Sequence, residues 1–270
     1  MFVLINPLKL GIFLALLGLS YFAFSQTSES TMSEEAKSAQ KMQNRLYPQI
    51  QLPITYNYNQ KLGASNQSQQ NQYGFNPIIP VVLGEDLQLI VNPMFTLNHN
   101  TNDQQVTNQA QPMQLATFIA PVYAKLFYVG IGPYLQLPAT NINNGSKQTG
   151  LGVSAGAFFT PEHWVIGAAM YNSWGIGNNM LGGSANLINV QPSISYTTDT
   201  AWTYNLGSQL TYNYDAKAAT NQLTFSGGKT VNLFGYHTQI QAGPTYMVTT
   251  TPTSAKGFGG FLGITVLLPK

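Results

Sequence analysis

From residue 49 onward, apolar and polar residues alternate with a period of two, and this alternation constrains the fold more than any other feature. In QIQLPITYNYN, residues 49–59, one face carries Ile50, Leu52, Ile54, Tyr56 and Tyr58, and the other carries Gln51, Pro53, Thr55, Asn57 and Asn59. Successive side chains of a β-strand point to opposite faces, so this segment has one apolar and one polar face. Such segments are typical of a barrel that contacts lipid outside and encloses a polar lumen.

Twelve segments of this kind follow one another, each about as long as the 9–11 residues of a tilted membrane strand. They cover about residues 49–59, 72–82, 87–98, 112–122, 126–137, 149–159, 163–173, 186–197, 200–213, 221–232, 237–249 and 257–268. The linkers alternate between long polar stretches and tight turns, as in barrels with long outer loops and short periplasmic turns. We therefore predict an all-β fold, a closed antiparallel transmembrane β-barrel of about 12 strands, with a short N-terminal helical segment.

The composition argues against the other classes of protein. Charged residues make up 7% of the chain and aromatic residues 12%, whereas a soluble domain has about 25% charged residues and a disordered chain has few aromatics. After residue 48, every charged residue except Lys229 lies in a predicted linker or at the terminus. The net charge of +2 gives no reason to expect nucleic-acid binding, and a chain without cysteine has no disulfide or thiolate metal site.

Two segments precede the barrel, which is predicted over residues 49–270. Lys9, the apolar run 10–24 and the small residue Ser25 indicate a signal peptide over residues 1–25. Residues 26–48 form a polar segment, and Thr31 with Glu34 could cap a helix over about 32–44. We expect this segment to lie in the periplasm outside the barrel wall, with a plug of the lumen as the alternative.

Proline and glycine inside the predicted strands carry two further expectations. Each proline removes a ladder hydrogen bond, so bulges or kinks are expected within the strands. The prolines concerned are Pro53, Pro77, Pro93, Pro121, Pro133, Pro192 and Pro244. Small residues on inward positions favour open space in the lumen, and these are Gly130, Gly132, Gly152, Gly156 and Gly207.

The residues predicted to line the lumen are mostly neutral and polar. They are Asn57, Asn76, Asn92, Tyr128, Tyr134, Gln136, Asn189, Gln191, Asn205, Gln209, Lys229, His237, Gln239 and Gln241. Strict alternation from Leu223 and Phe225 would place Lys229 on the outer face, but an outward ammonium at mid-depth costs about 2–4 kcal/mol. We therefore expect Lys229 to point inward, with a lysine near the rim reaching the lipid headgroups as the alternative.

Several stretches resemble a family of bacterial exported proteins. They are GPYLQLPAT at 132–140, VQPSISYTT at 190–198, the Gly-Lys of SGGKTVNLFG at 226–235, and GFLGITVLLPK at the carboxyl end. The family comprises outer-membrane transporters grouped with a phenol meta-pathway degradation protein, some of which carry the label neuromedin U. The resemblance spans about residues 37–270. It implies an outer-membrane barrel that moves small compounds, including aromatic ones, and an inward position for Lys229. The loops of this chain are richer in Asn and Gln, so no substrate is carried over.

Three classes of function remain. The first is a channel or facilitator of the bacterial outer membrane for small, weakly charged solutes, reached by signal-peptide-dependent export. The second is a structural or surface-interaction barrel with a plugged lumen. The third, an outer-membrane lipase, would need His237 as base beside a serine, and no GxSxG motif is present. We therefore expect no catalytic residues, no metal and no cofactor, with outer-membrane lipid, lipopolysaccharide and a small-molecule solute as partners.

Overall fold

The computed structural model describes residues 32–63, 65–101, 106–138, 148–176 and 185–269, so the predicted signal peptide lies outside the described residues. Its elements are helix α2 (Glu34–Gln43) and strands β1 (Gln51–Leu62), β2 (Ser68–Phe75), β3 (Ile79–Val82), β4 (Leu87–Thr101), β5 (Val106–Ala110), β6 (Gln114–Pro121), β7 (Phe127–Gln136), β8 (Thr149–Phe159), β9 (Trp164–Ile176), β10 (Leu187–Thr197), β11 (Trp202–Asn213), β12 (Ala218–Leu233), β13 (Tyr236–Thr249) and β14 (Gly257–Leu267). Within these ranges no helix has the length and apolar character that a membrane span requires.

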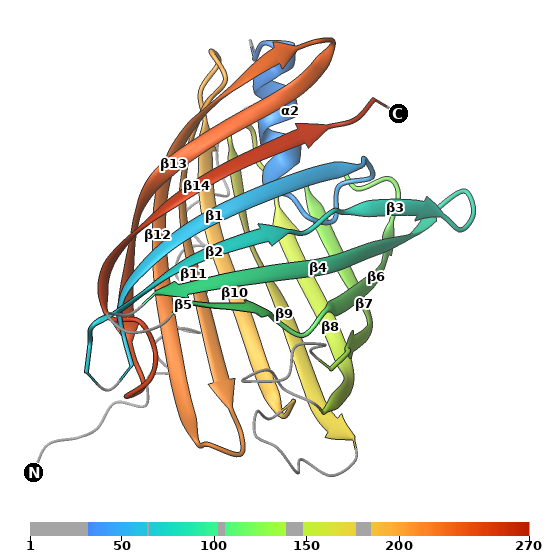
Figure 1. Ribbon diagram of the computed structural model, residues 1–270. Coiled ribbons are helices and arrows are strands. Elements are labelled where there is room, and N and C mark those ends of the chain that lie inside the picture. The colour runs from blue at the N-terminus through green and yellow to red at the C-terminus, as the bar shows by residue number, and fades with distance from the viewer. Residues whose placement is uncertain (1–31, 64, 102–105, 139–147, 177–184, 270) are drawn as a thin grey trace, which may run out of the picture. The chain divides into compact units, whose positions relative to one another are not determined.

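The strands form a closed antiparallel barrel (Figure 1). β2 and β3 together make one interrupted strand beside β4, and β5 and β6 make another on its other side, so the barrel has twelve strands, as predicted. Closure comes from β1 and β14, whose register runs from Gln51 opposite Leu267 to Tyr58 opposite Gly260. The strands are longer than predicted at the loop end, since β2 already begins at Ser68 and β4 continues to Thr101.

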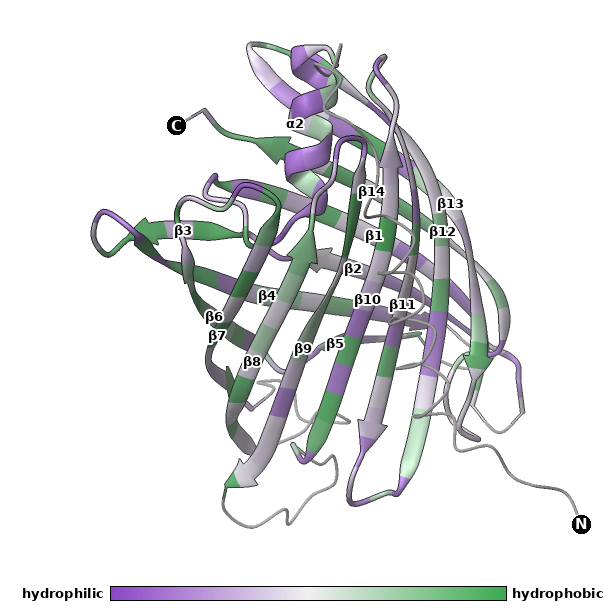
Figure 2. Ribbon diagram, turned by 180° about the vertical axis from the view of Figure 1, so that it is seen from behind, coloured by the Kyte–Doolittle hydropathy of each residue, from purple (hydrophilic) through white to green (hydrophobic). Residues whose placement is uncertain are grey.

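The outer face of the barrel is apolar. Figure 2 shows hydrophobic and hydrophilic residues alternating along the strands. Large apolar side chains on outward positions remain exposed, among them Ile54, Phe75, Phe95, Ile131 and Phe225. Several aromatic side chains meet on this face, such as Tyr56 with Tyr73 at 5.4 Å and Trp164 with Tyr196 at 4.8 Å between ring centroids. A soluble domain would leave such a surface to aggregate, whereas lipid covers it favourably.

The prolines interrupt the hydrogen-bond ladders without adding residues. Opposite Pro133, Pro192 and Pro244 some residue pairs are missing, but the register is the same on both sides of each gap. At Pro77 the strand itself breaks between β2 and β3, and the Asn92 side-chain amide donates to the carbonyl oxygens of Asn76 at 3.1 Å and Pro77 at 2.8 Å. The expected distortions therefore take the form of pairing gaps, and side chains satisfy the freed backbone groups.

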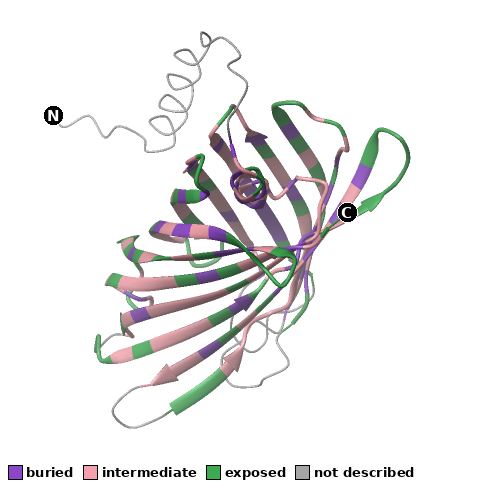
Figure 3. Ribbon diagram, turned by 90° about the horizontal axis from the view of Figure 1, so that it is seen from above, coloured by how far each residue is buried: buried purple, intermediate pink, exposed green. Residues whose placement is uncertain are grey.

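The N-cap of helix α2 lies two residues after the predicted one. Ser33, and not Thr31, is the N-cap residue, since its hydroxyl accepts the Ala36 N–H at 3.1 Å. The small apolar side of the helix, Ala36, Ala39 and Met42, is buried. The helix contacts β9 through β14, and Figure 3 shows it inside the ring of strands. Residues 32–48 thus differ from the expectation of a segment outside the wall.

Candidate functional site inside the barrel

The chain enters the barrel between helix α2 and β1, and side-chain amides hold it there. Asn44 Oδ1 accepts the Leu46 N–H at 2.9 Å, which turns the chain just after the helix. Gln51 Nε2 donates to the Asn44 carbonyl at 3.0 Å, and Gln88 Nε2 on β4 donates to the Leu46 carbonyl at 3.1 Å. Because these bonds tie backbone to the first strand and to the wall, the position of Leu46 is fixed inside the barrel.

Leu46 is completely buried in a cluster of inward side chains from β4, β6, β7, β8 and β9. The cluster contains Leu46, Ile78, Ile90, Met94, Ala116, Phe118, Ala120, Tyr128, Tyr134, Phe158, Val165, Ala169 and Tyr171. Its rings contact one another, with Tyr134 5.8 Å and Phe118 6.2 Å from the Tyr171 ring centroid. Burying one leucine side chain contributes about 1.5–3 kcal/mol, so this cluster stabilises the inserted segment.

The inward glycines make room for neighbouring groups more often than for open space. A Cβ on Gly156 would lie 3.5 Å from Leu46 Cδ1, so this glycine accommodates the inserted leucine. At Gly132 and Gly152 a Cβ would collide with a backbone carbonyl of the adjoining strand. A Cβ on Gly130 would lie 3.1 Å from Phe118 Cβ, so of the five glycines only Gly207 has open surroundings, with its nearest heavy atom at 3.9 Å. The expectation of open space therefore holds at Gly207 and is wrong at the other positions.

Two cations accompany the inserted segment. Arg45 Nη1 donates to the Tyr171 hydroxyl at 2.7 Å, deep on the inner face of β9. Lys41 Nζ lies 5.6 Å from the Tyr47 ring centroid. Burial raises the pKa of the Tyr47 phenol, because the phenolate would lose hydration, and the group therefore stays neutral at physiological pH.

At the loop end of the barrel, amide side chains form a continuous chain across the inner face, which we call the amide belt. It runs from Gln222 to Asn59 at 3.0 Å, on to Gln70 at 3.2 Å, to Asn100 at 3.0 Å and to Gln109 at 3.3 Å. A second row joins Asn57, Gln72 and Asn98 at 3.5 and 3.1 Å. Each amide keeps further donor or acceptor capacity, so the belt can hydrogen-bond a passing solute.

Twelve of the predicted lumen residues lie on the inward parity of their strands, and Asn76 lies in the break between β2 and β3. The twelve are Asn57, Asn92, Tyr128, Tyr134, Gln136, Asn189, Gln191, Asn205, Gln209, His237, Gln239 and Gln241. Gln239 is 2% exposed and donates to Thr203 at 3.0 Å while accepting from Gln43 of helix α2 at 2.8 Å. The structure thus brings some of these side chains to the inserted segment and others to the opposite end.

Lys229 is the exception, and the prediction that it points inward is wrong. Inward Ser226, Gly228 and Thr230 are buried, which places Lys229 on the opposite face of β12. Lys229 pairs with the outward Trp202 in the strand register, and its Nζ lies 5.4 Å from the Trp202 ring centroid. Close to the barrel rim, the long side chain can keep its ammonium near the headgroups, so the cost of a mid-depth charge is avoided.

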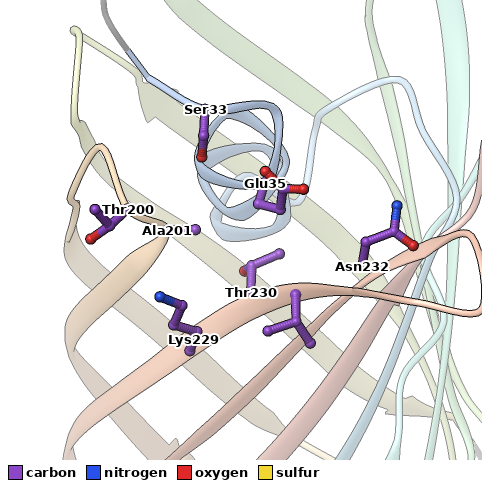
Figure 4. A pocket seen from close by; sticks show the side chains of 8 residues that line it. Ser33, Glu35, Thr200, Ala201, Lys229, Thr230 and Asn232 are labelled. Carbon is purple, nitrogen blue, oxygen red and sulfur yellow. The ribbon is translucent and has the colours of Figure 1, made fainter.

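Figure 4 shows the rim beside Lys229, where a pocket of about 310 Å³ opens between helix α2 and the end of β12. Ser33, Glu35, Thr200 and Thr230 contribute to its lining. The backbone N–H of Ser33 donates to the Asp199 carbonyl at 3.3 Å, which attaches the start of the helix to the β10–β11 turn. The pocket is therefore a notch in the rim, and Lys229 is the one predicted lumen residue among those that line it.

The histidines are dispersed. His99 bonds to Asn108 at 2.7 Å, and His163 bonds to the Thr197 carbonyl at 2.7 Å. His237 lines a pocket of about 250 Å³ together with Glu34 and Lys41. In the same pocket, the hydrogen bond and the charge of Lys37 lower the pKa of the Glu34 carboxyl. Across the described ranges, none of the three rings is hydrogen-bonded to a serine hydroxyl, which is the contact that a lipase base would need.

Sequence reasoning missed the apolar part of the interior and Arg45. Phe118, Phe158 and Tyr171 lie inward, although none of them is among the mostly polar residues predicted to line the lumen. The alternation in the sequence indicates the inward position of such residues, since Phe158 lies between the outward Ala157 and Phe159. Arg45 belongs to the segment that was expected outside the wall, so its place beside Tyr171 had no signal in the strand pattern.

No protein-family profile matches the sequence, and no curated protein does. Several solved structures are similar to it. An outer membrane channel from Pseudomonas putida F1 has a TM-score of 0.63 at 13% identity, covering 82% of this chain and 96% of that chain. Outer membrane phospholipase A from Escherichia coli has a TM-score of 0.47 at 11% identity, covering 83% of this chain and 98% of that one. The monoaromatic hydrocarbon channel CymD has a TM-score of 0.47 at 8% identity, covering 92% of this chain and 94% of that one. The likeness to the Pseudomonas channel extends to the barrel fold, and the resemblance to the phenol meta-pathway family stays a prediction.

Proposed function

We propose that the chain is a channel or facilitator of a bacterial outer membrane, exported by its signal peptide, that admits small, weakly charged solutes. The observation that carries the proposal is a closed barrel with an apolar outer face and a hydrogen-bonding amide belt inside. The described strands contain neither Asp nor Glu, so the wall offers hydrogen bonds without opposed charge clusters. Neutral polar solutes lose little free energy of hydration on entering such a lumen, because its amides replace part of their bound water.

A structural or surface-interaction barrel with a closed lumen is the second candidate. The complete burial of Leu46 favours it, because residues 44–50 occupy the turn end of the interior. An enzymatic role has less support, since His237 faces the interior near helix α2 and a lipase would place its base at the lipid-facing surface.

Conductance and solute flux separate the two candidates. Folded protein, identified by heat-modifiable migration on gels, is inserted into planar bilayers and into liposomes. A channel gives stepwise conductance, and the liposomes swell in small neutral sugars faster than in dianions of similar size. A closed structural barrel gives neither signal, while protein-free liposomes set the background rate.

Localisation has its own test. Cell fractionation should recover the protein with the outer membrane, and sequencing of the mature amino terminus should begin at Gln26. A mature protein that still starts at Met1 would contradict the proposed cleavage.

A further inference from the structure

Arg45 is a cation inside the barrel, and the side chain to which it hydrogen-bonds is neutral. The bond from Nη1 to the Tyr171 hydroxyl, 2.7 Å long, accounts for one of its five N–H donors. The ion pairs found in the described part of the chain, Lys37 with Glu34 and His163 with Asp199, do not include it. Arg45 is partly exposed in the interior, so its remaining N–H donors are available to an anion, which a guanidinium binds through charge-assisted hydrogen bonds.

The surroundings of Arg45 strengthen its attraction for an anion. Leu46, Phe118 and Tyr134 are almost fully buried close to Tyr171, and such apolar groups lower the effective dielectric constant and strengthen charge pairing. The neighbouring Tyr47 phenol is neutral, because burial raises its pKa. No acidic residue of any described strand opposes Arg45.

We propose that Arg45 is an anion-binding position that accepts the carboxylate of a small organic anion inside the barrel. The proposal rests on the proposed channel function and names a solute class for it. A planar guanidinium matches two carboxylate oxygens, which a point charge such as lysine does not. Tyr171 positions the guanidinium, because its buried hydroxyl oxygen accepts the bond from Arg45 Nη1.

Fluorine NMR of trifluoroacetate in the presence of the full-length, detergent-folded protein tests the proposal without any need for transport. We expect concentration-dependent line broadening for trifluoroacetate and none for the neutral trifluoroacetamide. Arg45→Gln should weaken binding on the order of tenfold or more, as the loss of a charge-assisted hydrogen bond implies. Arg45→Lys should retain part of the affinity, and Tyr171→Phe should lower it less than Arg45→Gln does.

Lys229→Gln is the matched control, since it removes the same charge from the outer face and should leave trifluoroacetate binding unchanged. Heat-modifiable migration of every variant verifies folding. Equal broadening for wild type and Arg45→Gln, or none for wild type, would overturn the proposal. Conductance of the same preparations judges the channel function separately: a conducting barrel without Arg45-dependent binding refutes the anion site alone.

Discussion

The two ends of the barrel interior are built from the same alternating strands but are filled in different ways. At the turn end, Leu46 packs among apolar and aromatic side chains of β4 and β6–β9. At the loop end, amides from β12, β1, β2, β4 and β5 bond to one another across the wall. An inward apolar side chain is therefore stable where another part of the chain covers it, whereas an uncovered inner face needs groups that tolerate water.

Deleting residues 32–48 should have the largest effect on the difference between the two ends of the interior. The deletion removes both helix α2 and Leu46, so the turn end would lose its filling and single-channel conductance should rise several-fold. The measurement is conductance in planar bilayers beside the full chain. Unchanged conductance would mean that residues 44–50 do not limit the path.

A single substitution can displace the same segment. Gly156→Leu should expel Leu46, because a Cβ there already lies 3.5 Å from it, and should raise conductance in the same direction as the deletion. Gly207→Leu is the matched control, because its surroundings are open at the other side of the barrel. Conductance that rises equally in both variants would point to a general loosening of the wall.

Leu46→Ala should weaken the attachment of the segment while leaving the barrel closed. Truncating a buried leucine costs about 2–5 kcal/mol, and here the cost falls on docking of residues 32–50. Trypsin should then cut faster after Lys41 and Arg45 in the folded barrel than in wild type. Equal cleavage rates would show that the amide bonds of Asn44 and Gln51 suffice to hold the segment.

Charge on the two faces of the wall should have separable effects on ion selectivity. Arg45→Gln should reduce the preference for anions, since the charge lies inside, whereas Lys229→Gln should leave it unchanged because the ammonium lies outside. Reversal potentials across a salt gradient measure both. A shift confined to Lys229→Gln would reverse the assignment of the two faces.

At the loop end, Asn59→Leu should break the amide belt. Gln222 and Gln70 would each lose a partner, which should cost about 1–3 kcal/mol in the free energy of unfolding. Gln60→Leu, one residue along, is the control that should cost less, because the bond that it removes, from Gln60 Nε2 to the Phe258 carbonyl, is exposed to solvent. Urea unfolding followed by tryptophan fluorescence compares the two.

The smallest effect is expected on the outer face. Trp202→Leu removes the ring beside Lys229, and an exposed cation–π contact contributes about 0.5–1 kcal/mol. The same urea titration, with circular dichroism as the probe because a tryptophan is lost, should show a small decrease. A loss as large as that of Asn59→Leu would indicate that Trp202 has a further structural role.

The barrel could be predicted from the sequence because alternation is a local property that each strand carries. Inward positions such as Asn57 and Gln239 follow from parity alone. For Lys229, strict alternation alone gives the observed outward position. The cost of a lipid-facing charge at mid-depth does not apply to it, because the residue lies near the rim, where its stem can reach the headgroups. Arg45 and Leu46 could not be placed, since their position depends on contacts with strands more than 40 residues away, such as Gln88 to Leu46.

The bond between Gln222 and Asn59 crosses β13 and β14, because β12 and β1 are not neighbours in the sheet. Gly259 lies on β14 between them, where a Cβ would come within 2.6 Å of Thr245 Oγ1 and collide with the Tyr58 carbonyl. The first and last strands must find each other across almost the whole sequence, which makes their pairing a slow, non-local step of folding. The amide bond spans this closing seam, so it can form only after the two chain ends have met, and it then acts as a latch that slows their separation.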